Sequence, residues 1–516
     1  MAVNTPAVAS PNTSRGDAPA GQTPGSKGLK AGAIGPLSNL IIGVASTAPA
    51  YSMAATLGAI VAVAGIGLSA PAVLIISFLP MLCISLAFNY MNRADPDCGI
   101  TFAWVTRAMG PQLGWLNGWV IIAADIIVMS SLSQIAGVYT FKLLGLNAAA
   151  NSQLDVMLVG VGWIALMTAV CVIGVELNAR TQAFMLTLEL GILVAFSIVA
   201  LVKVGTAHPP GSVTPSIGWV NPFQIPSYAS LMHGVLLGLF VYWGWDAGVS
   251  VNEESRDSDS GPGRMAVLST LLLVCVFVLV SVAAQAYAGP HALASNSSDI
   301  LSFLGIGVFG PGWDKLLILV VLTSTAASTQ TTILPTARCS LSMARWGAIP
   351  SVFGKIHPRY QTPWVSTVTM AGASAVLFIA MELLSQNVLA DSITAIGFLI
   401  AFYYGFTGLA CVVYYRRALL RSAKSFVLAG VLPLLGFAAL ALVFVEAYIN
   451  YSKPGAGYSP PLLGIQLPIV LGIGSLLLGV VLMAVAWTTE RDFFRRRPES
   501  SAPDALTTIV AERSVP

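Results

Sequence analysis

Charged side chains are scarce in this 516-residue sequence, where Asp, Glu, Lys and Arg together make up 9% of the chain. A soluble globular domain carries roughly 25% charged residues, so this composition excludes an ordinary water-soluble protein. Apolar residues make up 56% of the chain, and the mean hydropathy is +0.80. The composition therefore predicts an all-α polytopic membrane protein.

Cysteine and histidine are also rare, with six and four residues. No cysteine falls in a loop predicted to lie outside the cell, which excludes a disulfide framework, and no Cys or His shows the spacing of a metal site. The sequence has no His-Glu-x-x-His motif and no Ser/His pairing that would indicate a catalytic site. We therefore expect no metal, no cofactor and no enzyme activity.

Twelve apolar stretches are long enough to cross a bilayer, which takes roughly 20 apolar residues each. They predict twelve transmembrane helices, at 34–63, 68–91, 112–141, 154–174, 181–204, 228–253, 265–288, 313–344, 364–384, 388–415, 425–449 and 465–487.

The basic residues predict the orientation. If the N-terminus lies in the cytoplasm and the chain alternates across the membrane, the basic residues left outside are Lys142, Lys203, Lys315 and Lys453. This asymmetry follows the positive-inside rule, so we predict a multi-pass protein of the cell membrane with both termini in the cytoplasm. Topology and the lipid bilayer explain the basic residues, and we expect no nucleic-acid partner.

Both ends of the chain differ from the apolar middle. Residues 1–32 are rich in Ala, Pro, Gly, Ser and Thr and have no apolar core, which predicts a disordered cytoplasmic N-terminal tail. Residues 491–516 resemble them and are predicted to form a cytoplasmic C-terminal tail.

Two of the predicted spans are interrupted near their middles, at corresponding places in the two halves of the chain. In the first, Pro49 follows Ala45-Ser46-Thr47-Ala48; in the sixth, Gly244 and Gly248 flank Trp245-Asp246-Ala247. Pro removes a backbone donor and Gly weakens a helix, so each span becomes two half-helices whose ends attract a carboxylate or a cation. Such paired breaks indicate a transport site, whereas each alone is also explained by a kink or a packing notch.

Three acidic residues lie well inside the spans, away from their ends: Asp125, Glu189 and Asp246. No central Lys or Arg is available to pair with them, so each is expected to face a cavity, bind a cation or hold a proton. We predict Asp246 and Glu189 as the proton-coupling residues. Asp125 can alternatively bond a neighbouring helix, and Glu189 a helix Ser or Thr.

The candidate substrate site combines the two breaks with nearby polar and aromatic side chains. Mid-span tryptophans can wall a pocket and attract an ammonium group through cation–π interactions. In the polar run 323–332, Ser328 and Thr329 are candidate Na⁺ ligands, with close helix packing as the alternative. The predicted substrate-binding residues are Ala45, Ser46, Thr47, Ala48, Asp125, Tyr242, Trp243, Gly244, Trp245, Asp246 and Thr332.

Several motifs resemble one family. Residues 338–350, RCSLSMARWGAIP, resemble the R-x-L-x-A-M-A-R-D-G-x-L-P signature of the amino acid–polyamine–organocation permeases. Residues 96–110 resemble that family's P-x-A-G-G-x-Y…R-A-x-G segment, and Gly244-Trp245-Asp246 stands where the family usually has Gly-Phe-Glu. The resemblance covers roughly residues 33–417. The first break departs from the family pattern, because 46–49 replaces a Gly-Ser-Gly element and leaves fewer N–H groups for a carboxylate.

The resemblance implies a leucine-transporter-like fold with broken helices 1 and 6. Two inverted five-helix repeats, 33–205 and 228–417, would be joined by an extracellular linker at 206–227 and followed by two additional helices within 418–490. It also implies a secondary active transporter that imports an amino acid or an organic amine, such as a polyamine, by alternating access without a cofactor.

Protons are the expected coupling ion, with Na⁺ as the alternative. An exchanger without ion coupling, and a non-transporting membrane receptor with the same fold, remain alternative functions.

Overall fold

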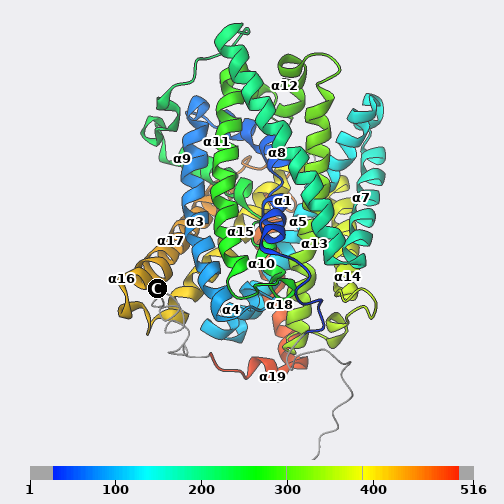
Figure 1. Cartoon of the computed structure of the whole chain (residues 1–516), viewed down its shortest axis with the longest axis vertical. Helices are drawn as coiled ribbons and strands as arrows, with labels where there is room; N and C mark the ends of the chain where they lie inside the picture. The colour runs from blue at the N-terminus through cyan, green and yellow to red at the C-terminus, as the bar shows by residue number, and fades with distance from the viewer. Residues whose placement is uncertain (1–26, 298, 386, 499–516) are drawn as a thin grey trace, which may run out of the picture.

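The computed structural model describes residues 27–297, 299–385 and 387–498, and every regular element in these ranges is helical. Eleven helical segments are long and apolar enough to cross a membrane. They stand side by side in one bundle (Figure 1). The prediction of an all-α polytopic membrane protein is confirmed.

The predicted count of twelve spans is not confirmed by helix length. The sixth predicted span, 228–253, is divided into α9 (Tyr228–Tyr242) and α10 (Ala247–Ser250). The first span is also divided, into α1 (Pro36–Ser46) and α2 (Pro49–Ala62), but these lie close enough in sequence to form one spanning segment, Pro36–Ala62.

The remaining elements connect in sequence order. The long helices are α3 (Ala70–Ala94), α5 (Pro111–Leu144), α7 (Gln153–Ile173), α8 (Val175–Thr206), α11 (Gly261–Ser295), α13 (Lys315–Arg345), α14 (Trp364–Leu384), α15 (Val388–Tyr415), α17 (Leu432–Tyr451) and α18 (Leu467–Thr489). The short helices are α4 (Thr101–Met109), α6 (Asn147–Ala150), α12 (Ile300–Phe309), α16 (Ala423–Ser425) and α19 (Arg491–Phe494). The 3₁₀ turns are η1 (Gly67–Ser69), η2 (Ile217–Val220), η3 (Pro222–Gln224), η4 (Asn252–Glu254), η5 (Ser351–Gly354) and η6 (Leu419–Arg421), and η7 (Phe426–Val431) is a π-helix.

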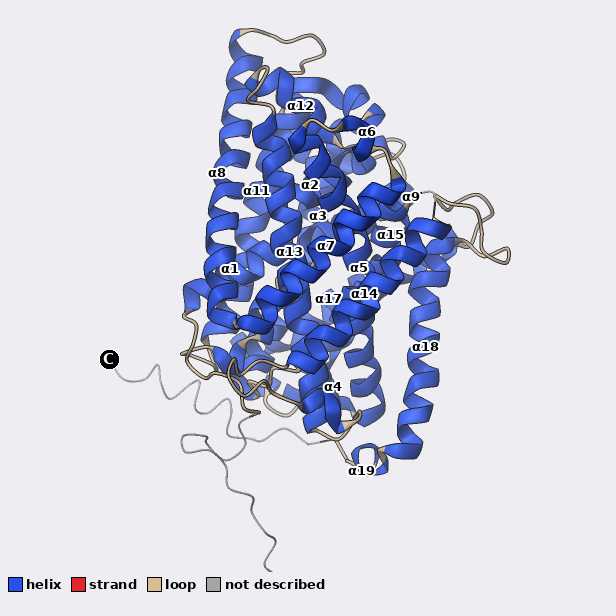
Figure 2. Cartoon of the chain, turned by 90° about the vertical axis from the view of Figure 1, so that its right-hand side faces the viewer, coloured by secondary structure: helices blue, strands red, loops and turns tan. Residues whose placement is uncertain are grey.

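The two ends of the bundle are named here by what lies at them. The tail side holds α19, and the α12 side holds α12 (Figure 2). Lys27 and Arg496 both reach the end of α13, through Arg345 and Trp346, so both ends of the described chain lie on the tail side.

Burial separates central helices from peripheral ones. In the most apolar stretch of each span, 89% of the residues of Pro36–Ala62 are buried and 78% of those of α5 and α13, against 11% for α18. The broken first span is therefore at the centre of the bundle, and α18 is left on its surface.

The two broken segments run in opposite directions. Helix α1 packs against α10, and α2 packs against α9. This is the arrangement that an inverted repeat requires; the repeat boundaries 33–205 and 228–417 stay a prediction.

The predicted N-terminal tail, 1–32, is only partly described. Residues 1–26 and, at the other end, 499–516 lie outside the described residues. Residues 27–32 lie against the bundle, where Lys27 is held by two acidic side chains. Ion pairing therefore orders the last part of a segment whose composition predicts disorder.

Candidate functional site

The first break is a two-residue interruption between α1 and α2. Ala48 adopts a left-handed backbone conformation, with φ of 46°. Pro49 has no N–H to continue the helix, but the Ala48 N–H donates to the Ala45 carbonyl over 3.1 Å. The carbonyl that Pro49 leaves without its helical donor is thus satisfied locally.

Other helices cap the start of α2. Glu189, from α8, accepts a hydrogen bond from the Ala50 N–H over 2.7 Å, and its same oxygen accepts one from the Ser324 hydroxyl over 2.7 Å. The Tyr51 N–H donates to the Ser324 hydroxyl over 3.2 Å. A carboxylate at a helix N-terminus is stabilised by the helix dipole, so Glu189 occupies the anion position of this break.

The second break touches the first. Gly244 has φ of 116°, and a Cβ atom there would lie 2.8 Å from the Ser46 carbonyl oxygen. One helical turn on, a Cβ at Gly248 would lie 2.4 Å from the Asn39 carbonyl oxygen. Glycine allows this backbone conformation and this close approach, which explains why the second break is rich in it.

Two tyrosines of α15 hold the carboxylate of Asp246. The Tyr404 hydroxyl donates to Asp246 Oδ1 over 2.9 Å, and the Tyr403 hydroxyl donates to Oδ2 over 3.1 Å. The Trp243 indole N–H donates to the Tyr403 hydroxyl, and the ring of Trp245 lies 5.0 Å from that of Tyr404. Asp246 is thus held by two tyrosines, each of which also contacts a tryptophan.

Asp125 approaches the same region from α5. Its carboxylate accepts a hydrogen bond from the hydroxyl of Thr336 on α13. The predicted residue Thr332 lies one turn before Thr336, and its carbonyl accepts from the Thr336 hydroxyl over 3.3 Å.

The structure distinguishes between the two predicted Na⁺ ligands. The Ser328 hydroxyl donates to the Ser46 carbonyl over 2.9 Å, so it reaches the first break. The Thr329 hydroxyl donates within its own helix, to the Thr325 carbonyl over 2.8 Å.

Tyr242, predicted to bind substrate, packs its ring against Phe78 and Phe277, 5.9 and 5.2 Å away. It belongs to the wall toward α3 and α11, and its hydroxyl group has no hydrogen-bond partner among the described residues.

The three membrane acids are buried and lack a basic partner. The exposed fractions of Asp125, Glu189 and Asp246 are 3%, 0% and 2%. Among the described residues, no ion pair joins any of them to Lys or Arg. Arg338 is buried at the tail side of the site but is paired with Glu254 over 2.6 Å. No basic side chain among the described residues is therefore available to balance the charge of these three acids when they are ionised.

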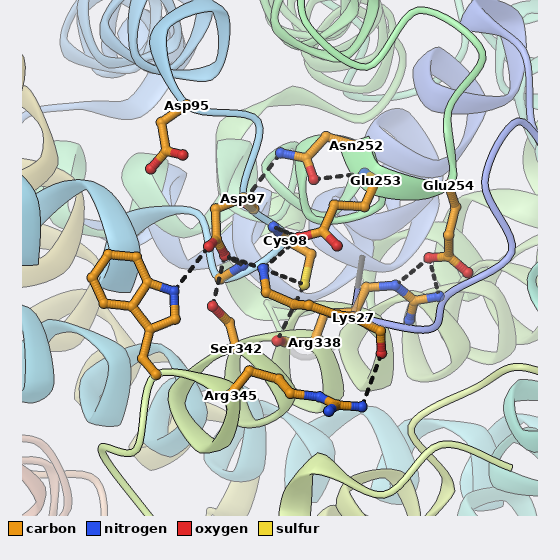
Figure 3. A network of polar contacts seen from close by, with 12 residues as sticks. Lys27, Asp95, Asp97, Cys98, Asn252, Glu253, Glu254, Arg338, Ser342 and Arg345 are labelled. Atoms are coloured by element: carbon orange, nitrogen blue, oxygen red, sulfur yellow. Dashed lines mark hydrogen bonds and ion pairs between the residues drawn. The ribbon is translucent and has the colours of Figure 1, made fainter. Parts of the chain in front are cut away.

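Ionic contacts close the tail side (Figure 3). The Lys27 ammonium is 2.7 Å from Asp97, before α4, and also contacts Glu253, which follows α10. Asp97 accepts further hydrogen bonds from Ser342 and Trp346, over 2.6 and 3.1 Å. Lys27 thus ties the N-terminal segment to both halves of the chain.

The opposite charges in this closure stabilise each other's ionised forms. Burial lowers the pKa of the Lys27 ammonium, but the acidic groups of Cys98, Asp97 and Glu253 outweigh burial and raise it above its usual range. Burial likewise opposes ionisation of Asp97, but Lys27 and the hydrogen bond from Ser342 hold the pKa of Asp97 below its ordinary value. Ligand atoms of Asp97, Cys98 and Glu253 lie within 4.8 Å of one another, as in a metal site, yet Lys27 contacts all three.

A smaller closure lies on the α12 side. Asp299, before α12, accepts from the Tyr139 hydroxyl and pairs with Lys142 at the end of α5. Contacts thus join different segments at both ends of the bundle, and the residues of the two breaks are buried.

This arrangement agrees with comparison to known proteins. The family model described as amino acid permease matches residues 38–482. The chain belongs to the amino acid permease family. This permease is 25% identical over 346 residues to the cationic amino acid transporter 3, mitochondrial, of Arabidopsis thaliana, covering 61% of this chain and 52% of the relative.

Two further relatives differ in their named substrates. The methylthioribose transporter of Bacillus subtilis (strain 168) is 23% identical over 323 residues, covering 58% of the permease and 66% of the relative. The human Asc-type amino acid transporter 1 is 26% identical over 368 residues, covering 70% and 67%. The permease thus spans between about half and two thirds of the length of these relatives.

Proposed function

We propose that this permease is a secondary active transporter of the cell membrane that imports an amino acid or an organic amine by alternating access, coupled to protons. The distribution of basic residues supports cytoplasmic termini, which makes the tail side cytoplasmic. Amino acid transporters among the relatives support the substrate class.

The closures at the two ends support alternating access. Opening toward the cytoplasm requires Lys27 to leave Asp97 and Glu253, and opening toward the outside requires Asp299 to release Lys142. The ion pairs at the two ends join different segments of the chain, so those at one end can separate while those at the other end stay formed. The buried breaks lie between them.

The observation that carries the proposal is the pair of carboxylates at the two breaks. Asp246 and Glu189 are buried, and no Lys or Arg among the described residues forms an ion pair with them. An unpaired buried charge is costly in a membrane. A proton or a cationic substrate relieves that cost. The cost of burying the carboxylates returns when the proton or the substrate leaves. We therefore expect binding of the proton and of the substrate to be coupled to the conformational change.

The test is uptake by purified permease in liposomes. A panel of labelled amino acids and amines is offered at two pH values, with and without Na⁺. We expect uptake that rises with an inward proton gradient and is independent of Na⁺, and that Asp246→Asn abolishes the effect of the gradient. Asp391→Asn is the matched control, because this Asp is also buried but bonds Ser385 and Ser459 away from the breaks.

Two outcomes contradict the proposal. Uptake that needs substrate on the inside and ignores pH identifies an exchanger. Binding of a ligand without any uptake identifies a receptor.

A further inference from the structure

We infer that the substrate is an organic amine that carries no carboxylate, because the carboxylate of Glu189 occupies the position that a substrate carboxylate would need. This inference rests on the proposed transport function and narrows its substrate class.

The donors at the start of α2 are all used. Pro49 has none; the N–H groups of Ala50 and Tyr51 donate to Glu189 and to the Ser324 hydroxyl. The N–H of Ser52 donates to the Ala48 carbonyl over 2.8 Å. A substrate carboxylate at this break would have to displace Glu189 from these donors.

The second break offers no replacement. Helix α10 has only four residues, and the residue before it is Asp246. The four N–H groups of α10 all donate to carbonyl groups of residues 244–246, so none is left for an incoming carboxylate. Both breaks are therefore closed to an anion.

The same groups favour a cation. Asp125 and Asp246 attract an ammonium. Tyr403 and Tyr404 contact Asp246, and Trp243 and Trp245 pack against these two tyrosines. Aromatic faces bind organic cations through their quadrupoles. The second oxygen of Glu189 has no hydrogen-bond partner among the described residues, and an ammonium can supply one.

Matched pairs that differ only in the carboxylate test this inference: agmatine against arginine, cadaverine against lysine, and tyramine against tyrosine. Binding to the purified permease is measured by calorimetry, and uptake is measured in liposomes. In the pair that binds most tightly, we expect the amine to bind about 10- to 100-fold more tightly than the corresponding amino acid. The reason is that the amino acid would bury a carboxylate without a partner. Equal or tighter binding of the amino acids overturns the inference, as does binding of neither member of any pair.

The two measurements separate this inference from the proposed function. Selective binding of amines without uptake supports the substrate class and refutes transport. Uptake of amino acids in preference to amines supports transport and refutes the substrate class.

Variants of Glu189 test its part directly. Glu189→Ala frees the Ala50 N–H for a substrate carboxylate, so the preference for the amine over its amino acid is expected to fall about tenfold or more. Glu189→Gln keeps an acceptor for Ala50 but removes the charge, and is expected to give an intermediate preference even if the Ala variant does not fold. An unchanged preference in Glu189→Gln would show that this carboxylate does not exclude amino acids.

Discussion

The contact between the two breaks makes Gly244→Ala the most informative single change. The added methyl group would lie 2.8 Å from the Ser46 carbonyl oxygen and 2.9 Å from its carbon, both backbone atoms that cannot rotate away. A non-glycine residue at φ of 116° costs about 1–3 kcal/mol, and overpacking adds about 1–3 kcal/mol. We expect the two breaks to separate. The arrangement in which they touch should be destabilised by about 2–6 kcal/mol in all.

Substrate binding and thermal unfolding measure this loss. If only about 2 kcal/mol of it falls on the binding-competent arrangement, affinity drops about 30-fold. Gly474→Ala is the control, because a Cβ on this glycine of α18 meets nothing within 4 Å; it should leave binding intact and stabilise the helix by about 1 kcal/mol. Wild-type affinity and stability in Gly244→Ala would refute the contact between the breaks.

Further changes test the tail side. Lys27→Gln should weaken the contacts on that side, so that the buried Cys98 reacts faster with a maleimide added from the tail side. The Cys98→Ala variant gives the background rate to subtract, and a corrected rate equal to that of the wild type would contradict this. Arg338→Met should lower the free energy of unfolding by about 3–5 kcal/mol, because it leaves Glu254 buried and unpaired, and adding Glu254→Leu should restore most of it. Burial and the nearby carboxylate of Asp97 raise the pKa of Asp95 from 3.8 to about 6. The folded state therefore binds the Asp95 proton more tightly than the unfolded state does. Its contribution to stability is greatest below pH 3.8 and is lost as the pH rises to about 6, and Asp95→Asn should remove that part of the pH dependence of thermal unfolding.

Much of the site was predictable from local sequence signals. Pro49 and the glycines at 244 and 248 mark helix breaks by backbone chemistry alone. Acidic residues in apolar spans mark Asp125, Glu189 and Asp246 without knowledge of the fold. These signals are local, and all six residues are buried in the structure.

The partners of these residues were not predictable, because they come from distant helices. Tyr403 and Tyr404 lie 157 and 158 residues from Asp246, and their only signal is a Tyr-Tyr pair within an apolar stretch. The cap that Glu189 supplies to α2 joins residues 139 apart. Lys27 was missed because the polar composition around it predicts disorder, while its ion pairs form only after residues 97 and 253 come together.

Charge movement through the permease tests the central claim most directly. Liposomes with the purified permease are placed on a sensing electrode, and the current is recorded when an amine of the preferred pair is added at decreasing outside pH. The account predicts an inward current that grows as the outside pH falls and that disappears in Asp246→Asn. An undiminished current in Asp246→Asn, with the same dependence on pH, would contradict the assignment of the second break as the coupled transport site.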